Sequence, residues 1–234
     1  MVFLHGYAQS RTGWMTTPDG RDGWNDMFLK KGYSTYLVDQ PRRGEAGQTS
    51  EAQEISTATQ DQAWFTQFRM GRWPEFNEGS QFPQDEESVD QFFRQMTDVF
   101  EQSGPGVLVT HSQGGFPFPE SDMPEPVEAG YYTVEGVPMS DEDFAKMIEK
   151  PIVVYFGDYI PDEESDLPAE NFWRAVREMG YQFAETVNER GGDCTIIYLP
   201  DEGITGNSHF MFQELNNEEI ADHIYNWLEK HNLG

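Results

Sequence analysis

Ser112 is the residue whose surroundings most favour a reactive hydroxyl. It lies in Thr110–Gly114, "THSQG", a loose match to the pattern small-x-Ser-x-Gly, in which small flanking residues let the chain turn sharply and lift the serine above a sheet. An apolar run, Val107–Val109, precedes it as the pattern requires. Two features depart from the pattern: Thr110 stands where glycine is commoner, and four prolines between Phe116 and Val127 follow where a regular helix is expected. By itself the motif fits either a nucleophile or one more hydroxyl in a polar loop.

A second element is the apolar run that enters His5-Gly6. Glycine there lets the backbone turn so that the next N–H points above the sheet, where it supplies half of an oxyanion hole. We expect the N–H groups of Tyr7 and Gln113 to be the two donors. Taken singly, His5-Gly6 equally fits an ordinary hydrogen-bonded loop.

A general base must lie on a loop above the sheet if it is to reach the serine hydroxyl. His209, in "GNSH" between the last apolar run and the last helical pattern, meets this requirement. The other four histidines lie in the first turn, beside the serine or within a helical pattern: His5, His111, His223 and His231. We therefore predict His209 as the base.

The acid that orients the base has two candidates. Asp158 ends the apolar run "IVVYFGD", and Glu135 ends the preceding run, "YYTVEG". A carboxylate at either place would hold the imidazole in the right tautomer and stabilise its charged form. Because both residues occupy the carboxyl end of a predicted strand, spacing does not choose between them.

Short apolar runs alternate with helical patterns along most of the chain. The runs are continuous, as expected for strands covered on both faces: Val2–Leu4, Thr35–Val38, Val107–Val109, Tyr131–Val134, Ile152–Phe156 and Thr195–Leu199. Helical patterns are expected at Trp24–Lys31, from Ser140 to about Glu149, over Phe172–Val187 and near Asn217–His231. The prediction is an α/β fold with a mostly parallel sheet and helices on both faces.

We expect one domain over 1–234, with 45–104 as a helical cap. No clear strand is found from Glu45 to Gly106, whereas aromatic residues are dense there: Trp64, Phe65, Phe68, Trp73, Phe76 and Phe82. Such a segment is too long for a plain loop in a compact domain. It predicts a cover over the carboxyl edge of the sheet, lining an apolar pocket. Part of it, Val89–Phe100, also fits an ordinary core helix on the face of the sheet.

The order His-Gly, Ser, acid, His on alternating strands and helices resembles the α/β-hydrolase fold. More closely, the chain resembles a group of secreted bacterial and fungal serine esterases, through "HGYAQSRTGWMTTPDGRDGW", "GYSTYLVDQPRRG", "AWFTQFRMGRWPEF", "THSQGG", "VEG", "FGDYI" and "GNSHFMFQELNN". In that group the acid is a glutamate directly after the strand that follows the nucleophile, which the resemblance places at Glu135 rather than Asp158.

The resemblance implies hydrolysis of small-molecule carboxylic esters through an acyl-enzyme, with no cofactor and no metal, in a secreted or periplasmic protein. Alternatives are an amide, lactone or polyester hydrolase with the same triad, or a non-catalytic binding protein of this fold. Relatives of the group carry two further strands ahead of the His-Gly strand, and this sequence begins directly at "MVFLHG". A missing sheet edge would favour a homo-oligomer or lower the stability of the fold.

Composition narrows the classes of partner. The formal net charge is -27, from 42 acidic and 15 basic residues, which argues against nucleic acid and anionic membranes as partners. This acidity fits an ordinary solvated surface or adaptation to high salt equally well. The single cysteine, Cys194, excludes an intramolecular disulfide and is expected to be a buried small hydrophobe.

Overall fold

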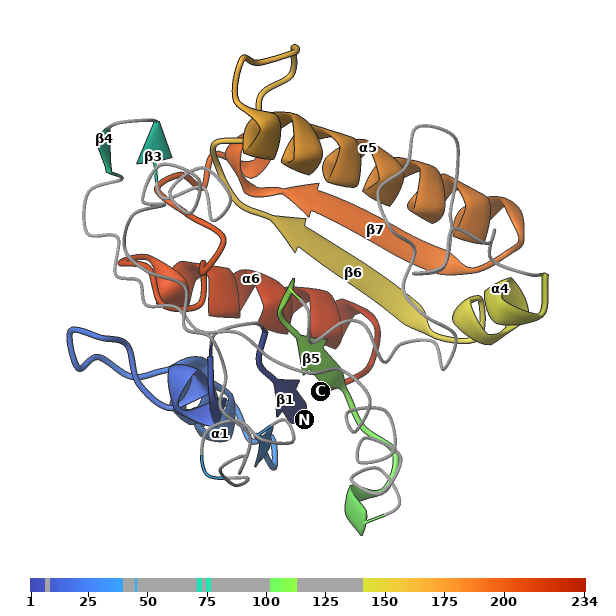
Figure 1. The fold of residues 1–234 in the computed structure, drawn as a ribbon. Coiled ribbons are helices and arrows are strands. Elements are labelled where there is room, and N and C mark those ends of the chain that lie inside the picture. The colour runs from blue at the N-terminus through green and yellow to red at the C-terminus, as the bar shows by residue number, and fades with distance from the viewer. Residues whose placement is uncertain (7–8, 40–44, 46–70, 73–74, 77–101, 113–140) are drawn as a thin grey trace, which may run out of the picture. The chain divides into compact units, whose positions relative to one another are not determined.

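The computed structural model describes residues 1–6, 9–39, 45, 71–72, 75–76, 102–112 and 141–234 (Figure 1). The chain divides into two units. The first comprises Met1–Thr57, Gln81–Glu120 and Phe212–Gly234, and the second comprises Ala58–Ser80 and Ser121–Met211.

The first unit contains a parallel sheet of three short strands. β1 (Val2–Leu4) lies between β2 (Tyr36–Val38) and β5 (Leu108–Thr110). All three residues of β1 are buried, as its uninterrupted apolar sequence predicts for a central strand. Leu4 is level with Val38 on one side and with Thr110 on the other, so the three strands end at one edge.

Helices and aromatic rings build the core of the first unit. It contains the 3₁₀ turn η1 (Arg11–Trp14), α1 (Trp24–Lys30) and α6 (Asn217–Lys230), and α1 packs on α6. Trp14 stacks on Phe212 with ring centroids 4.3 Å apart, and it also contacts Phe3 with ring centroids 5.3 Å apart. Few but large side chains therefore bury the apolar surface, in keeping with the high aromatic content of the sequence.

The second unit is a layer of helix on sheet. β6 (Pro151–Phe156) pairs in parallel with β7 (Asp193–Tyr198), and α5 (Pro168–Glu189) runs alongside them (Figure 1). α4 (Asp141–Met147) precedes β6, and the 3₁₀ turn η4 (Leu199–Glu202) follows β7. A two-stranded antiparallel ladder, β3 (Gly71–Arg72) with β4 (Glu75–Phe76), also belongs to this unit. A core cluster joins the elements: Phe144, Ala184, Val187 and Cys194.

The predicted α/β class is confirmed, and each expected element that the structure describes is present. Five of the six apolar runs are parallel strands, while Tyr131–Val134 lies outside the described residues. α4 ends at Met147, two residues before the expected Glu149. Cys194 is buried, as expected. The segment 45–104 is described only in fragments, so the cap and the single-domain organisation stay predictions. No helix among the described residues is long and apolar enough to cross a bilayer.

Candidate active site

Ser112 lies on a strained turn at the carboxyl end of β5. Its φ angle is 52°, in the left-handed region that residues with a side chain rarely adopt. Such a conformation costs about 1–3 kcal/mol and persists where the surroundings enforce it. The residue is exposed, whereas His111 before it is buried. The structure thus places the serine of the sequence motif on a sharp turn above the sheet edge.

Gly6 lies directly against this turn. Leu4 is level with Thr110, and the N–H of His111 donates to the Leu4 carbonyl at 3.1 Å, so the chain leaves β1 and β5 side by side. A Cβ on Gly6 would lie 2.9 Å from the Cβ of Ser112 and 2.8 Å from the carbonyl oxygen of His111. Only glycine therefore fits here, which explains its place after the first strand.

A buried carboxylate holds the loop after β1. Asp39, at the end of β2, accepts hydrogen bonds from the backbone N–H groups of Arg11 at 2.7 Å and Glu45 at 2.9 Å. Its Oδ1 lies 3.7 Å from Nε2 of His5, whose Nδ1 is 2.9 Å from the Gly6 carbonyl oxygen. His5 is completely buried. It thus belongs to the polar framework of the turn.

His209 lies in the loop between η4 and α6. Gly206 has a φ of 91°, which allows the chain to reverse before "NSH". Asn207, Ser208 and His209 are all buried, and the N–H of Phe210 donates to the Ser208 hydroxyl at 3.1 Å. The predicted base is therefore held in an ordered loop.

Asp158 fastens this loop to the end of β6. Its carboxylate accepts the N–H of Asn207 at 2.7 Å, and its own N–H donates to the Asn207 carbonyl at 2.7 Å. Gly157 allows the approach, because a Cβ there would lie 2.6 Å from the Ser208 carbonyl oxygen. The alternative acid of the sequence analysis thus has a clear contact of its own, with the backbone two residues before the base.

Trp173, from the N-terminal part of α5, packs on the base itself. The centroids of its ring and the imidazole of His209 are 4.7 Å apart, with the planes tilted by 46°. Phe210 meets the imidazole edge-on at 5.1 Å. Two aromatic side chains therefore restrict the rotation of the His209 ring.

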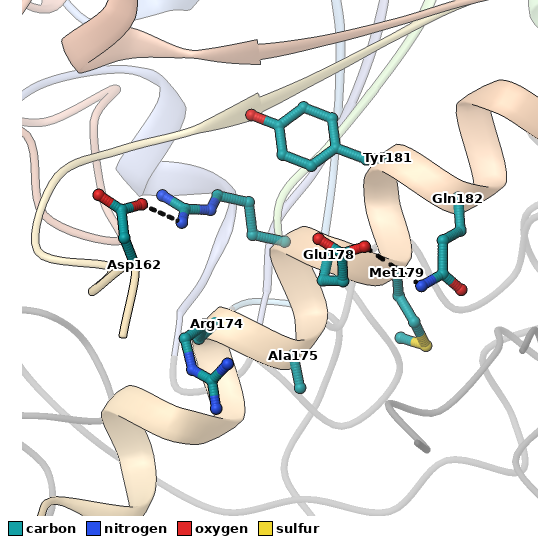
Figure 2. A pocket seen from close by; sticks show the side chains of 8 residues that line it. Asp162, Arg174, Ala175, Glu178, Met179, Tyr181 and Gln182 are labelled. Carbon is teal, nitrogen blue, oxygen red and sulfur yellow. Dashed lines mark hydrogen bonds and ion pairs between the residues drawn. The ribbon is translucent and has the colours of Figure 1, made fainter. Parts of the chain in front are cut away.

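A cavity of about 330 Å³ lies along α5 (Figure 2). Its polar groups largely pair with one another: Arg177 contacts Asp162 at 2.7 Å, and Gln182 donates to Glu178 at 3.3 Å. Neither Ser112 nor His209 lines it; its lining comprises Asp162, Arg174, Ala175, Arg177, Glu178, Met179, Tyr181 and Gln182. We assign no catalytic role to this cavity.

The structure describes the surroundings of some of the predicted site residues, whose catalytic roles stay predictions. It brings Gly6 against Ser112 in the first unit, and Asp158 against the His209 loop in the second. Tyr7, Gln113 and Glu135 lie outside the described residues, so their roles stay predictions. Within the described part of the chain, no group of His, Cys, Asp or Glu side chains has a metal-binding arrangement.

Sequence reasoning missed Trp173 and Gly157. Trp173 was hidden in an amphipathic helix, and its one available signal was a helical spacing of four from the buried Arg177. Gly157 precedes Asp158 in "FGD", where a glycine between an apolar strand and a candidate acid indicates a close backbone approach.

Comparisons with known proteins agree on the class of relative. A fungal protein (Fungal sp., strain ATCC 74256), described as the probable secreted lipase phiG, is 26% identical over 303 aligned positions, covering 98% of this chain and 81% of the relative. A solved structure of a novel bacterial esterase matches with a TM-score of 0.73 and 27% identity, over 98% of this chain and 80% of that one. No family model matches. The resemblance to an α/β-hydrolase-like esterase group is confirmed.

Proposed function

We propose that this chain is a carboxylic-ester hydrolase in which Ser112 is the nucleophile and His209 the general base. His209 takes the proton of the Ser112 hydroxyl as the oxygen attacks the ester carbonyl, and returns a proton to the leaving alcohol. Water then attacks the acyl-enzyme with help from the same base and releases the acid. The lipase and esterase relatives support the reaction class.

The observation that carries the proposal is the strained backbone of Ser112. A positive φ is uncommon for a residue with a side chain, and Ser112 holds a φ of 52° directly after a parallel strand. This is the conformation that a nucleophile on a strand-to-helix turn requires, because the sharp turn exposes the hydroxyl and directs the next backbone N–H toward the reacting carbonyl.

The proposed oxyanion hole is assigned from the residues next to the same turn. Gly6 is pressed against Ser112, and Tyr7 is the next residue along the chain. In the proposal, the N–H groups of Tyr7 and Gln113 hold the negative oxygen of the tetrahedral intermediate. Donors that are already in place when charge develops stabilise a transition state without reorganisation.

Glu135 is the proposed acid, and Asp158 the anchor of the base loop. The carboxylate of Asp158 binds the backbone of Asn207, which gives it a role independent of the imidazole. Glu135 then completes a Ser-His-Glu triad, as in the esterase group that the sequence resembles. A small-molecule ester is the proposed substrate, with the aromatic segment 45–104 as the wall of its pocket.

Replacing the nucleophile tests the central assignment. Ser112→Ala should lower kcat on a p-nitrophenyl ester by on the order of 10⁶-fold, because no other group supplies the attacking oxygen. A fluorophosphonate probe should label the wild-type protein once and the variant not at all. Ser103→Ala, which removes a half-buried hydroxyl ahead of β5, is the matched control and should remain active. Full activity in Ser112→Ala would refute the mechanism.

A pair of charge-neutralising variants tests the acid. Glu135→Gln should lower kcat by about 10⁴-fold, the loss typical of an acid that orients a catalytic histidine. Asp158→Asn keeps an oxygen that accepts the Asn207 N–H and should lose only about tenfold, the worth of one charge-assisted hydrogen bond. The opposite ranking would assign the triad acid to Asp158.

A further inference from the structure

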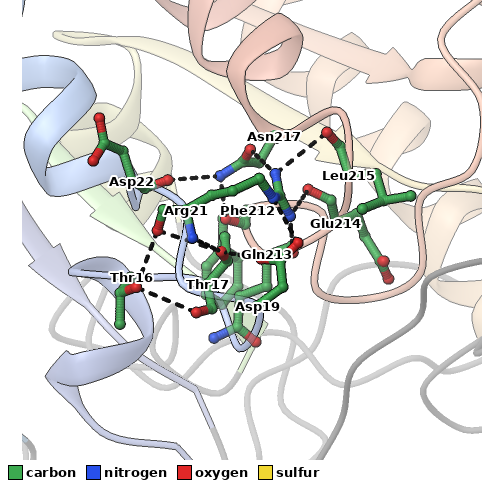
Figure 3. Close-up of polar contacts among 10 residues, drawn as sticks. All are labelled: Thr16, Thr17, Asp19, Arg21, Asp22, Phe212, Gln213, Glu214, Leu215 and Asn217. Carbon is green, nitrogen blue, oxygen red and sulfur yellow. Dashed lines mark hydrogen bonds and ion pairs between the residues drawn. The ribbon is translucent and has the colours of Figure 1, made fainter.

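Arg21 holds the segment that follows the base loop. Arg21 reaches residues 213–217, which follow His209 and end at the first residue of α6 (Figure 3). Its guanidinium donates to the backbone carbonyls of Gln213 at 3.3 Å, Glu214 at 3.1 Å and Leu215 at 3.3 Å. A fourth hydrogen bond, to the Asn217 side-chain oxygen, is 2.8 Å long. One side chain thus fixes the backbone of three successive residues.

Hydrogen bonds within its own turn fix both the backbone and the guanidinium of Arg21. The N–H of Arg21 donates to the Thr17 hydroxyl at 2.9 Å, and Gly20 takes a φ of 85° to close the turn. Asp19 accepts Nε of Arg21 at 2.8 Å, and this hydrogen bond is the main cause that lowers the pKa of Asp19 to about 2. The carboxylate therefore stays charged and holds the guanidinium plane in place.

A second contact ties the same two segments together. The indole N–H of Trp24 donates to the Asn217 carbonyl at 2.9 Å, and the Asn217 amide donates to the carbonyls of Asp22 at 3.2 Å and Phe212 at 3.3 Å. Glu214 and Asn217 are almost completely buried. The 213–217 segment is irregular and has no strand ladder to satisfy its carbonyls, so the planar fork of an arginine suits it better than a lysine.

We propose that Arg21 is a positioning residue for His209. The base lies two residues after Asn207, which Asp158 holds, and four residues before Gln213, which Arg21 holds. The loop is thus fixed at both of its ends by buried or half-buried polar contacts. Without Arg21 the segment after the base loses the hydrogen bonds to the carbonyls of Gln213, Glu214 and Leu215 and keeps the contacts of Trp24 and Asn217. A displacement of about 1 Å at a catalytic group is enough to cost 10²-fold in rate. This inference rests on the proposed role of His209.

The test is a kinetic comparison of Arg21→Ala, Arg21→Lys and the wild type on a p-nitrophenyl ester. We expect Arg21→Ala to lower kcat by about 10²-fold with KM unchanged, since the loss concerns the base and not the pocket. Arg21→Lys should lose about tenfold, because a lysine retains the charge without the fork. Arg190→Ala is the matched control, since Arg190 also binds a carboxylate and a carbonyl but near the C-terminus of α5.

Chemical rescue separates positioning from general stability. Added guanidinium at about 50 mM, far below denaturing concentrations, should restore part of the kcat of Arg21→Ala, and the same concentration of sodium chloride should not. A kcat equal to that of wild type in Arg21→Lys and Arg21→Ala overturns the inference, as does a loss that guanidinium leaves unchanged. If Arg21→Ala fails to fold, Arg21→Lys decides alone. Inactive Ser112→Ala beside fully active Arg21 variants would refute the positioning role and leave the proposed function intact.

Discussion

The turn that carries Ser112 and the loop that carries His209 both pack against a glycine, but they differ in how the functional side chain is oriented. Each lies against a glycine that has no room for a Cβ: Gly6 beside the serine and Gly157 beside the histidine loop. The difference is in what orients the residue itself. Ser112 is oriented by its own strained backbone, whereas His209 is oriented by side chains, through the Asp158 anchor and the ring of Trp173.

This difference follows from what the proposed chemistry requires. A nucleophilic hydroxyl has one short bond to rotate, so a fixed backbone is sufficient to place it. An imidazole must present one nitrogen and keep the other paired, which demands control of ring rotation by neighbours. Substitutions near the serine should therefore have abrupt, steric effects, and those near the histidine should have graded effects.

Among the substitutions next to the two proposed catalytic residues, Gly6→Ala should lower kcat the most. The new methyl group would lie within 2.9 Å of the Ser112 turn, so the turn or the β1 loop must move, and with it the proposed oxyanion donor Tyr7. We expect kcat on a p-nitrophenyl ester to fall by about 10³-fold, the upper range for loss of one such donor. Gly106→Ala, just ahead of β5, is the control, because its added Cβ meets nothing within 4 Å. An active Gly6→Ala protein would contradict the steric account of the turn.

Gly157→Ala is the corresponding change on the base side. Its Cβ would lie 2.6 Å from the Ser208 carbonyl oxygen and 2.7 Å from that of Asn207, displacing the loop one or two residues before His209. A loop is more easily displaced than a turn that directly follows a strand of the sheet, so we expect a smaller loss of kcat, about 10²-fold. The measurement is kcat for both glycine variants under one set of conditions. A loss greater than that of Gly6→Ala would reverse the comparison.

Trp173→Leu should have a graded effect, because it frees the imidazole of His209 without moving the backbone. We expect kcat to fall by about two- to tenfold, the effect of an aromatic contact of about 0.5–1.5 kcal/mol. Trp173→Phe should recover most of it. Trp227→Leu is a matched control, since Trp227 in α6 also stacks on a histidine, His231 just after that helix, at 4.0 Å, and His231 has no role in the proposed mechanism. Equal losses in the two leucine variants would show that Trp173 acts through stability alone.

The sequence predicts the elements better than it predicts their contacts. β1, β5, β6 and β7 are foreseeable because buried parallel strands are continuous apolar runs, and His209 because chain order and loop setting exclude the other histidines. The Ser112 turn lies against Gly6, about a hundred residues away, and the Asp158–Asn207 bond joins residues 49 apart. Local patterns carry no record of such pairings, which arise from strand order and register.

Chemical labelling of Cys194 reports on the core of the second unit, separately from the Ser112 turn in the first unit. It is the single cysteine, it is buried at the start of β7 in the core of the second unit, and burial raises the pKa of its thiol to about 12. In the folded chain at pH 8 it should therefore resist iodoacetamide, whereas an exposed thiol reacts. The raised pKa also makes the stability of the fold depend on pH. Above the pKa of the unfolded chain, near pH 9, the unfolded chain loses a proton that the folded chain keeps, so stability falls as pH rises.

In a urea titration at pH 8, fluorophosphonate labelling of Ser112 should disappear before iodoacetamide labelling of Cys194 begins. The strained turn needs only a local adjustment to lose its geometry, while Cys194 reacts only when the cluster of Phe144, Ala184 and Val187 opens. Because the chain has one thiol, complete labelling is one equivalent and the two curves are read on the same scale. Coincident midpoints would mean that the turn is as stable as the core, and the strain at Ser112 would then be held by the whole fold.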